Sequence, residues 1–147
     1  KLDRVKKGVN IGILIAMAGT LIIVIPLMCF SDTMLKLFNS DPAVLRYGRM
    51  FVLYMSPFYI PYCATQIYSG ALRGAGDSLS PMIVTIASFV VFRQLYLLIG
   101  TQFISSPLFV GLSYPAGWIV STAALFIIYR SGRWERKLPA HVRMQAA

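Results

Sequence analysis

The stretch GVNIGILIAMAGTLIIVIPLMCF, residues 8–30, decides the fold class because it is long, apolar and free of charged side chains. A helix needs about 20 predominantly apolar residues to cross the hydrocarbon core of a membrane, and this stretch is long enough. A helix on the surface of a soluble protein would show a polar stripe with a period of about 3.6 residues, and this one does not. The stretch therefore predicts a transmembrane helix.

Three later segments of the chain have the same apolar character, and short turns containing Gly, Ser, Asn or Pro separate them. We therefore predict an all-α fold: a polytopic bundle of four transmembrane helices in a single membrane domain over residues 1–147. The expected helices cover residues 8–30, 42–72, 81–103 and 107–129, and a polar tail follows at 130–147.

The composition supports a membrane protein and excludes most other classes. Hydrophobic residues make up 57% of the 147 residues and charged residues 13%, against roughly 25% charged residues in a soluble domain. A disordered chain, a collagen-like fibre and nearly every water-soluble fold are excluded. The net charge of +9 lies between the apolar segments, which indicates a membrane lipid surface as the partner and no nucleic acid.

The basic residues also predict an orientation. Of the 14 Lys and Arg residues, ten fall on one side of the predicted helices and three on the other, and Arg93 lies within a helix. The positive-inside rule then places both ends and the loop at 73–80 in the cytoplasm. We expect a multi-pass protein of the plasma (inner) membrane of a bacterium. The chain opens on Lys1 with no initiator Met, and we expect it to be a piece of a longer protein.

The second helix is expected to be irregular. Asp41 places a capping side chain before Pro42 at the first helical position, so the helix begins clearly. Pro57 and Pro61 then stand one turn apart near its middle and remove two backbone donors, so the helix must kink or open there. Non-helical backbone at membrane depth survives only where protein or a water-filled cavity covers it. These two prolines are our candidates for a kink and for gating.

Polar and aromatic residues follow one face of this second helix at spacings of four and three. Two interpretations remain open: the face packs on neighbouring helices and hydrogen-bonds across them, or it lines a substrate cavity. Under the second interpretation, the candidate cavity residues are Tyr59, Tyr62 and Gln66. The whole face comprises Met55, Tyr59, Tyr62, Gln66, Ser69 and Arg73.

Arg93 is a further candidate residue of the substrate cavity. It lies about 18 Å into the third helix at 1.5 Å per residue, near the middle of a hydrocarbon core of about 30 Å. A charge at that depth is costly and is normally buried against a partner or a wet cavity. No acidic residue of the chain lies at the same depth. Two interpretations remain open: a structural tie to another part of the protein, or a direct part in the transport path.

The sequence carries none of the usual signals of an enzyme. No pair of carboxylates lies at membrane depth, and no Ser/His/Asp set or Gly-rich phosphate loop is present. His141 lies in the polar tail, and Cys29 and Cys63 lack metal-ligand spacing. We therefore expect no catalytic residues, no metal site and no cofactor.

The stretch SGALRGAGDSLSPM, residues 69–82, resembles the most recognisable C-terminal motif of the MATE family, the multidrug and toxin extrusion transporters. Phe30-Ser31-Asp32 and Ser40-Asp41-Pro42 resemble the external connector that leads into the tenth helix of that family. Gly117-Trp118 and the basic run RSGRWERK, residues 130–137, are similar to the last helix and the end of the family. The resemblance extends from about residue 6 to about residue 137.

The resemblance implies a transporter of twelve helices in two lobes around a central cavity, of which this chain would supply helices nine to twelve. It implies an antiporter that exports small organic, often cationic, substrates by alternating access, driven by Na⁺ or H⁺. The family couples through membrane carboxylates, and none lies between Arg49 and Asp77. The ligands of the coupling ion are therefore expected elsewhere, and the remaining helices of the same transporter are expected partners.

Four residues match the cytoplasmic loop motif of the family: Arg73, Gly74, Gly76 and Asp77. We interpret them as structural or gating residues rather than as substrate contacts.

Two alternative functions remain open. A flippase of the same superfamily would move a lipid or a lipid-linked oligosaccharide, but such proteins carry several cationic cavity residues, whereas Arg93 is the one basic residue expected at membrane depth. A stand-alone membrane scaffold of four helices is the other alternative.

Overall fold

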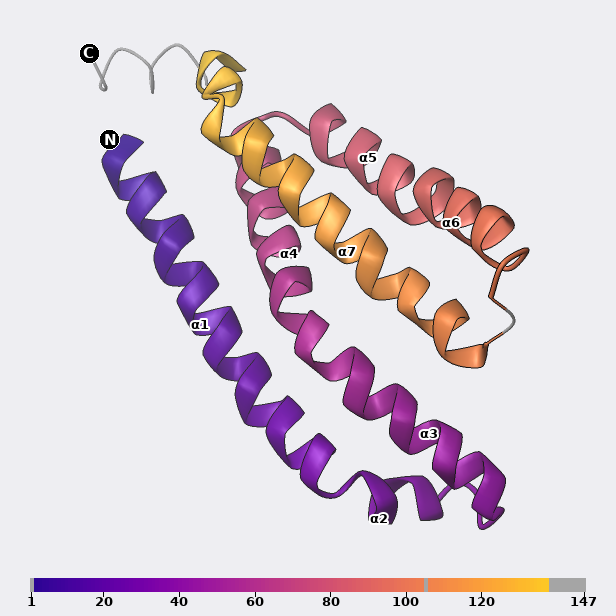
Figure 1. The fold of residues 1–147 in the computed structure, drawn as a ribbon. Helices are drawn as coiled ribbons and strands as arrows, with labels where there is room; N and C mark the ends of the chain where they lie inside the picture. Colours follow the sequence, from indigo (N-terminus) through magenta and orange to yellow (C-terminus); the bar gives the residue numbers. More distant parts are fainter. Residues whose placement is uncertain (1, 105, 138–147) are drawn as a thin grey trace.

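A computed structural model describes residues 2–104 and 106–137, and these residues form helices joined by turns, with no strand among them (Figure 1). The predicted all-α membrane bundle is confirmed. The elements are α1 (Leu2–Cys29), α2 (Ser31–Lys36), α3 (Pro42–Met55), η1 (Ser56–Phe58), α4 (Tyr59–Gly74), α5 (Leu79–Ile86), η2 (Ala87–Phe92), α6 (Arg93–Gly100), α7 (Pro107–Arg130) and η3 (Arg133–Lys137).

Three helical segments are long and apolar enough to cross a membrane: Arg4–Cys29, Leu79–Gly100 and Pro107–Arg130. The second helix was expected over 42–72 with a kink or an opening at its prolines, and the structure divides it there. One turn of 3₁₀ helix, η1, separates α3 from α4, so neither part reaches spanning length alone. The break falls at Pro57, since a proline inside a helix removes a backbone donor and clashes with the preceding turn.

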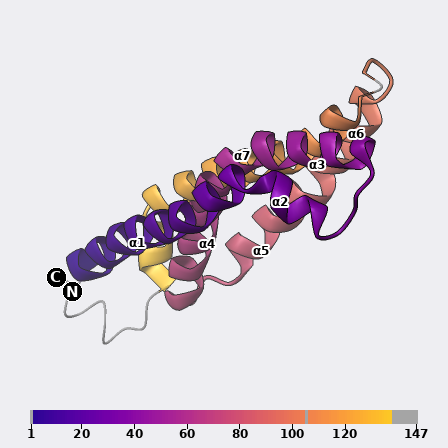
Figure 2. The same cartoon turned by 90° about the horizontal axis from the view of Figure 1, so that it is seen from below.

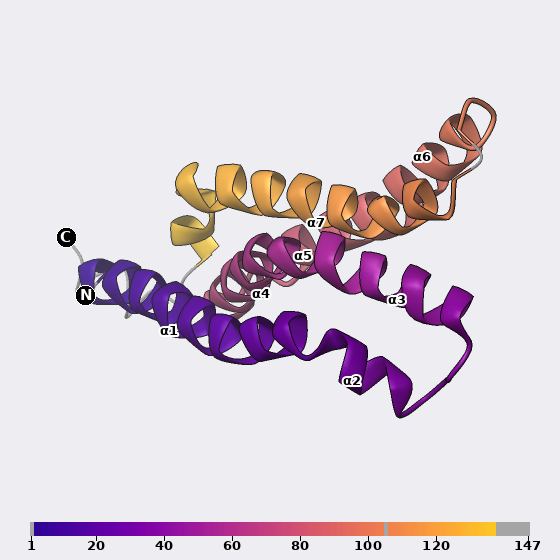
Figure 3. The same ribbon diagram turned by 60° about the horizontal axis from the view of Figure 1, so that its bottom comes forward.

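The helices lie side by side in a row rather than around a closed core (Figures 1, 2 and 3). α4 packs between α1 and α7, and α7 in turn packs between α3–α4 and the helix formed by α5, η2 and α6. Most of α1 is therefore uncovered by the rest of the described chain, with Val9 and Val24 as its buried apolar side chains. Such an exposed apolar face is suited to lipid or to further helices.

The start of α1, the turn between α4 and α5, and η3 lie at one end of the bundle, whereas α2 and the loop before α7 lie at the other (Figure 1). At the first end, Lys6 Nζ lies 2.9 Å from Glu135 Oε1, which ties α1 to η3. The basic residues that the positive-inside rule used, Arg4, Lys7, Arg73 and Arg130 among them, are on segments that meet at this end.

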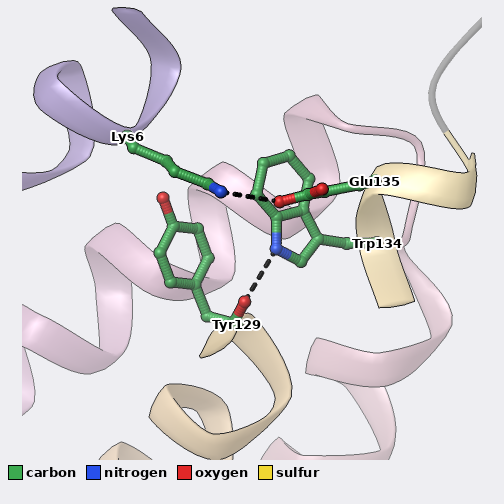
Figure 4. A network of polar contacts seen from close by, with 4 residues as sticks. All are labelled: Lys6, Tyr129, Trp134 and Glu135. Carbon is green, nitrogen blue, oxygen red and sulfur yellow. Dashed lines mark hydrogen bonds and ion pairs between the residues drawn. The ribbon is translucent and has the colours of Figure 1, made fainter. Parts of the chain in front are cut away.

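The main apolar cluster of the described chain lies at this same end. Leu72, Ala75, Val84, Leu125 and Trp134 are all buried there. The indole nitrogen of Trp134 donates a 2.8 Å hydrogen bond to the carbonyl oxygen of Tyr129, and the two rings stack with centroids 5.3 Å apart (Figure 4). The tryptophan thus docks η3 onto the end of α7 and onto α4 and α5.

The turn after α4 closes that helix with a Schellman motif. The amide of Asp77 donates to the carbonyl of Leu72 at 2.9 Å, and the amide of Gly76 donates to that of Arg73 at 3.0 Å. Gly76 has φ of 87°, a conformation that L-residues with a side chain rarely adopt. The carboxylate of the buried Asp77 then accepts the Ser80 hydroxyl at 2.7 Å and the Ser80 amide at 3.3 Å, which anchors the start of α5.

Replacing Gly76 with Ala should destabilise the protein. A Cβ at positive φ costs about 1–2 kcal/mol, so the thermal midpoint of the detergent-solubilised protein, followed by circular dichroism, should fall. Gly74→Ala is the matched control, because Gly74 ends α4 with open space around it and should leave the midpoint unchanged or slightly higher. Equal midpoints for the two variants would contradict this account of the turn.

Trp134→Ala should cost far more stability than Glu135→Gln. Deleting a fully buried indole costs about 3–5 kcal/mol. By contrast, the Lys6–Glu135 pair has side chains that are 51% and 31% exposed, and pairs of that kind contribute about 0–1 kcal/mol. The same thermal midpoints measure both variants, and a larger fall for Glu135→Gln would show that the ion pair, not the ring, holds η3.

Candidate functional site

A polar contact between α4 and α7 sets the position of these two helices. The hydroxyls of Thr65 and Thr122 lie 2.7 Å apart, and the Thr122 hydroxyl also lies 2.7 Å from the carbonyl oxygen of Pro61. Either hydroxyl can donate to the other, and the Thr122 hydroxyl has a second carbonyl acceptor at 2.7 Å, that of Trp118 on its own helix. Hydrogen bonds between membrane helices contribute about 0.6–2 kcal/mol each, so this contact stabilises the α4–α7 interface.

One turn earlier on α7, Trp118 packs against two tyrosines of α4. Its ring centroid lies 5.4 Å from that of Tyr59 and 5.1 Å from that of Tyr62. Tilted aromatic pairs at such distances contribute about 0.5–1.5 kcal/mol beyond their buried area. The three rings form a continuous aromatic wall between α4 and α7.

On the other side of α7, the helix α5–α6 contains a π-helical segment, η2. Five residues of a regular α-helix turn through about 500°, which would leave Ser88 and Arg93 about 140° apart around the helix. The i→i+5 bonding of η2 widens the turn, and both residues line one cavity. Gly117 of α7 faces the same segment, and a Cβ there would lie 3.2 Å from the carbonyl oxygen of Ser88.

The cavity has a volume of about 260 Å³ and lies between α7, the start of α4 and the π-helical segment. Its lining is mostly aromatic, with two serine hydroxyls and one guanidinium. The lining residues are Tyr62, Ser88, Phe89, Arg93, Ser113, Tyr114, Gly117 and Trp118.

Arg93 is held in this cavity by a ring rather than by a carboxylate. Its guanidinium carbon lies 3.7 Å from the centroid of the Tyr114 ring, a close cation–π contact. Its Nε is buried and has no hydrogen-bond partner within the described part of the chain. Asp32, Asp41, Asp77 and Glu135 all belong to segments at the ends of the bundle.

The structure brings two of the four predicted cavity residues together, Tyr62 and Arg93. Tyr59 packs on the far part of the same aromatic wall but does not line the cavity, and Gln66 is exposed outside it. Gln66 lies one turn beyond Tyr62, at the level where Thr65 and Thr122 close the space between α4 and α7.

The other predicted residues lie away from the cavity lining. Pro57 lies in η1, and Pro61 lies in the first turn of α4. The loop-motif residues Arg73, Gly74, Gly76 and Asp77 form the end of α4 and the turn after it, and Arg73 Nε donates to the carbonyl of Ser69 at 3.3 Å. In this structure they stabilise a turn.

Sequence reasoning missed most of the cavity wall. Trp118 belongs to the Gly117-Trp118 pair that was singled out for its resemblance to the family, but no cavity role was predicted for it, and Tyr114 was not singled out at all. Ser88 and Ser113 are polar residues inside apolar helices, and both are buried. Their polarity was the available signal, but pairing Ser88 with Arg93 required the π-helical turn.

The fold and the cavity define the class: a multi-pass membrane protein of packed helices with a polar and aromatic cavity between them. A family model for MatE matches residues 1–99, and the chain belongs to this family.

Two curated proteins are similar to the chain. It is 26% identical over 106 residues to a probable multidrug resistance protein, YpnP of Bacillus subtilis, which is 72% of this chain and 24% of that protein. It is 25% identical over 109 residues to a probable multidrug resistance protein, NorM of Thermotoga maritima, which is 74% of this chain and 24% of that protein. The chain thus spans about a quarter of the length of these relatives. No solved structure matches it significantly.

Gly117→Ala should destabilise the packing of α7 on the π-helical segment. The new Cβ would press on a backbone carbonyl, which cannot move as a side-chain tip can, and overpacking of this kind costs about 1–3 kcal/mol. Gly70→Ala on α4 is the control, since no heavy atom of the described chain lies within 4 Å of its Cβ position. A thermal midpoint for Gly117→Ala as high as that of Gly70→Ala would refute the close approach.

Proposed function

We propose that this chain is the C-terminal third of a cation-coupled multidrug efflux antiporter, corresponding to helices nine to twelve of twelve. The match of the MatE family model to residues 1–99 carries this proposal. The printed names of both curated relatives, probable multidrug resistance proteins, supply the substrate class that we extend to this chain. Export would be driven by Na⁺ or H⁺ moving inward.

The cavity beside α7 would be part of the substrate path. It offers the aromatic surfaces of Tyr62 and Trp118, which suit flat organic molecules, together with hydroxyl groups that orient a ligand. The two irregular segments, η1 and η2, both contact α7. Bending at η1, where Pro57 interrupts the helix, would open and close the cavity as the transporter alternates between its two states.

The coupling ion would be bound by carboxylates outside this chain. Within residues 2–104 and 106–137, no group of three His, Cys, Asp or Glu side chains is placed to hold a metal ion. Both ends of the chain would lie in the cytoplasm of a bacterial cell, because the basic residues gather at the end of the bundle that holds the start of α1 and η3.

Tyr62→Ala should impair efflux by the intact protein that contains this chain. The measurement is the rate of ethidium and of tetraphenylphosphonium export from cells that express it. Loss of an aromatic contact of about 0.5–1.5 kcal/mol corresponds to an export rate that is roughly two- to tenfold slower. We expect the rate to fall by different factors for the two substrates, because they differ in shape.

Tyr54→Ala is the matched control for this prediction, because Tyr54 is exposed on α3 and does not line the cavity. Expression and thermal midpoint are measured for both variants, so that loss of folding is separated from loss of transport. Wild-type export of both substrates by Tyr62→Ala would remove the cavity from the substrate path. An intact protein that exports neither substrate would contradict the proposed function itself.

A further inference from the structure

Arg93 carries a charge at a place where the described structure does not neutralise it. It begins α6 within the apolar span Leu79–Gly100, and seven residues at 1.5 Å each put it about 10 Å from the end of that span. A basic residue inside a membrane span is normally paired with a carboxylate, with backbone carbonyls or with a ligand. Within the described part of the chain, no salt bridge to Arg93 is formed.

The contact with Tyr114 uses the flat face of the guanidinium and not its hydrogen-bonding edges. The ring lies 3.7 Å from the guanidinium carbon, as in a cation–π contact. The Nε donor is buried and has no partner among the described residues, so the charge of Arg93 is not fully satisfied by the described chain. A ligand in the cavity would meet the terminal nitrogens, and the edge that they form matches a carboxylate or phosphate, which accepts two parallel hydrogen bonds.

The rest of the cavity suits the organic part of such an anion. Phe89, Tyr62 and Trp118 contribute ring surfaces, and Ser88 and Ser113 contribute hydroxyl groups. The volume of about 260 Å³ is below the range of about 300–1,000 Å³ typical of sites for drug-sized ligands. The cavity therefore accommodates one ring and its acidic group rather than a whole large drug.

The fixed positive charge also acts against a cation. The cavity lining contains no acidic side chain that would offset the charge of Arg93. Like charges a few ångströms apart in a medium of low dielectric constant repel strongly. An organic cation would therefore be excluded from the position beside the guanidinium.

We propose that the cavity beside Arg93 binds the oxyanion group, a carboxylate or a phosphate, of a single-ring organic anion. Binding of the anion does not depend on the proposed function; only the statement that the bound anion is a transported substrate rests on it. This statement adds molecules that carry an acidic group, zwitterions included, to the substrates proposed above.

The test measures binding to the intact protein in nanodiscs of phosphatidylcholine by isothermal titration calorimetry. Benzoate and benzamide are the probes, since they share shape and differ in charge, and benzylammonium is the cationic comparison. The wild type should bind benzoate about ten- to hundredfold more tightly than benzamide, the range expected for charge-assisted hydrogen bonds. Equal affinities, or tighter binding of benzylammonium, would overturn the proposal without any variant being needed.

Variants then test whether the preference for benzoate over benzamide depends on Arg93. Arg93→Gln should abolish it, and Arg93→Lys should keep part of it, because an ammonium retains the charge but not the two-pronged geometry. Arg46→Gln is the matched control, since Arg46 is exposed on α3 outside the cavity, and it should keep the full preference. A full preference in Arg93→Gln would assign anion binding to another site and refute the proposal.

A second set of nanodiscs, containing phosphatidylglycerol, distinguishes the source of the oxyanion. If the head group of a lipid occupies the cavity, benzoate binding to the wild type should weaken at least tenfold and Arg93→Gln should show no such change. If benzoate binding is unaltered, the ligand is a soluble anion. Both results support an oxyanion site at Arg93.

The binding test of the anion site and the transport test of the proposed function can fail independently of each other. A protein that prefers benzoate through Arg93 but exports nothing from proteoliposomes would keep the anion site and lose the transport proposal. A protein that exports tetraphenylphosphonium and shows no preference for benzoate would keep the transport proposal and lose the anion site.

Discussion

The hydrogen bond between the Thr122 hydroxyl and the Pro61 carbonyl is the contact on which the arrangement of the helices depends. In a membrane no water competes for a polar side chain between helices, so the Thr122 hydroxyl takes its partners from α4 and from its own helix. α4 begins directly after a 3₁₀ turn and contains a proline in its first turn, and α7 approaches it there. The 2.7 Å contact, joined by Thr65 at 2.7 Å, fixes both the height and the rotation of α7 relative to α4.

The cavity follows from that register. Trp118 lies one turn before Thr122 and therefore meets the tyrosines at the start of α4, while the adjacent Gly117 faces the opposite helix. Because glycine has no side chain, α7 approaches the carbonyl of Ser88 closely, at the segment where the turn is widened into a π-helix. The same widening places Arg93 on the cavity side. The cavity therefore lies beside α7, between the polar contact with α4 on one face of that helix and the close approach at Gly117 on the other.

Sequence was sufficient for the parts of the structure that depend on local chemistry. Long uncharged segments predicted the helices, and Asp41 before Pro42 predicted a helix start at which the Asp41 carboxylate accepts the Ala43 amide at 2.8 Å. Spacing along the second helix does not by itself tell which residues of its face line this cavity: Gln66 lies outside it, beyond the level where Thr65 and Thr122 meet. The π-helical turn was not predictable either, since Ala87–Phe92 is as apolar as its neighbours and packing decides its form.

The distribution of regular and irregular backbone also bears on how such a site would work. α7 is helical over all of its 24 residues although it contains Pro115, whereas the helices on either side of it each contain one irregular segment, η1 or η2. Irregular segments bend more readily, because fewer of their backbone bonds follow the regular pattern. Motion at η1 would shift α3 relative to α4 and alter the aromatic wall, whereas motion at η2 would shift Arg93 relative to Tyr114. The site therefore lies between two helices with irregular segments, so bending at either segment would change its shape.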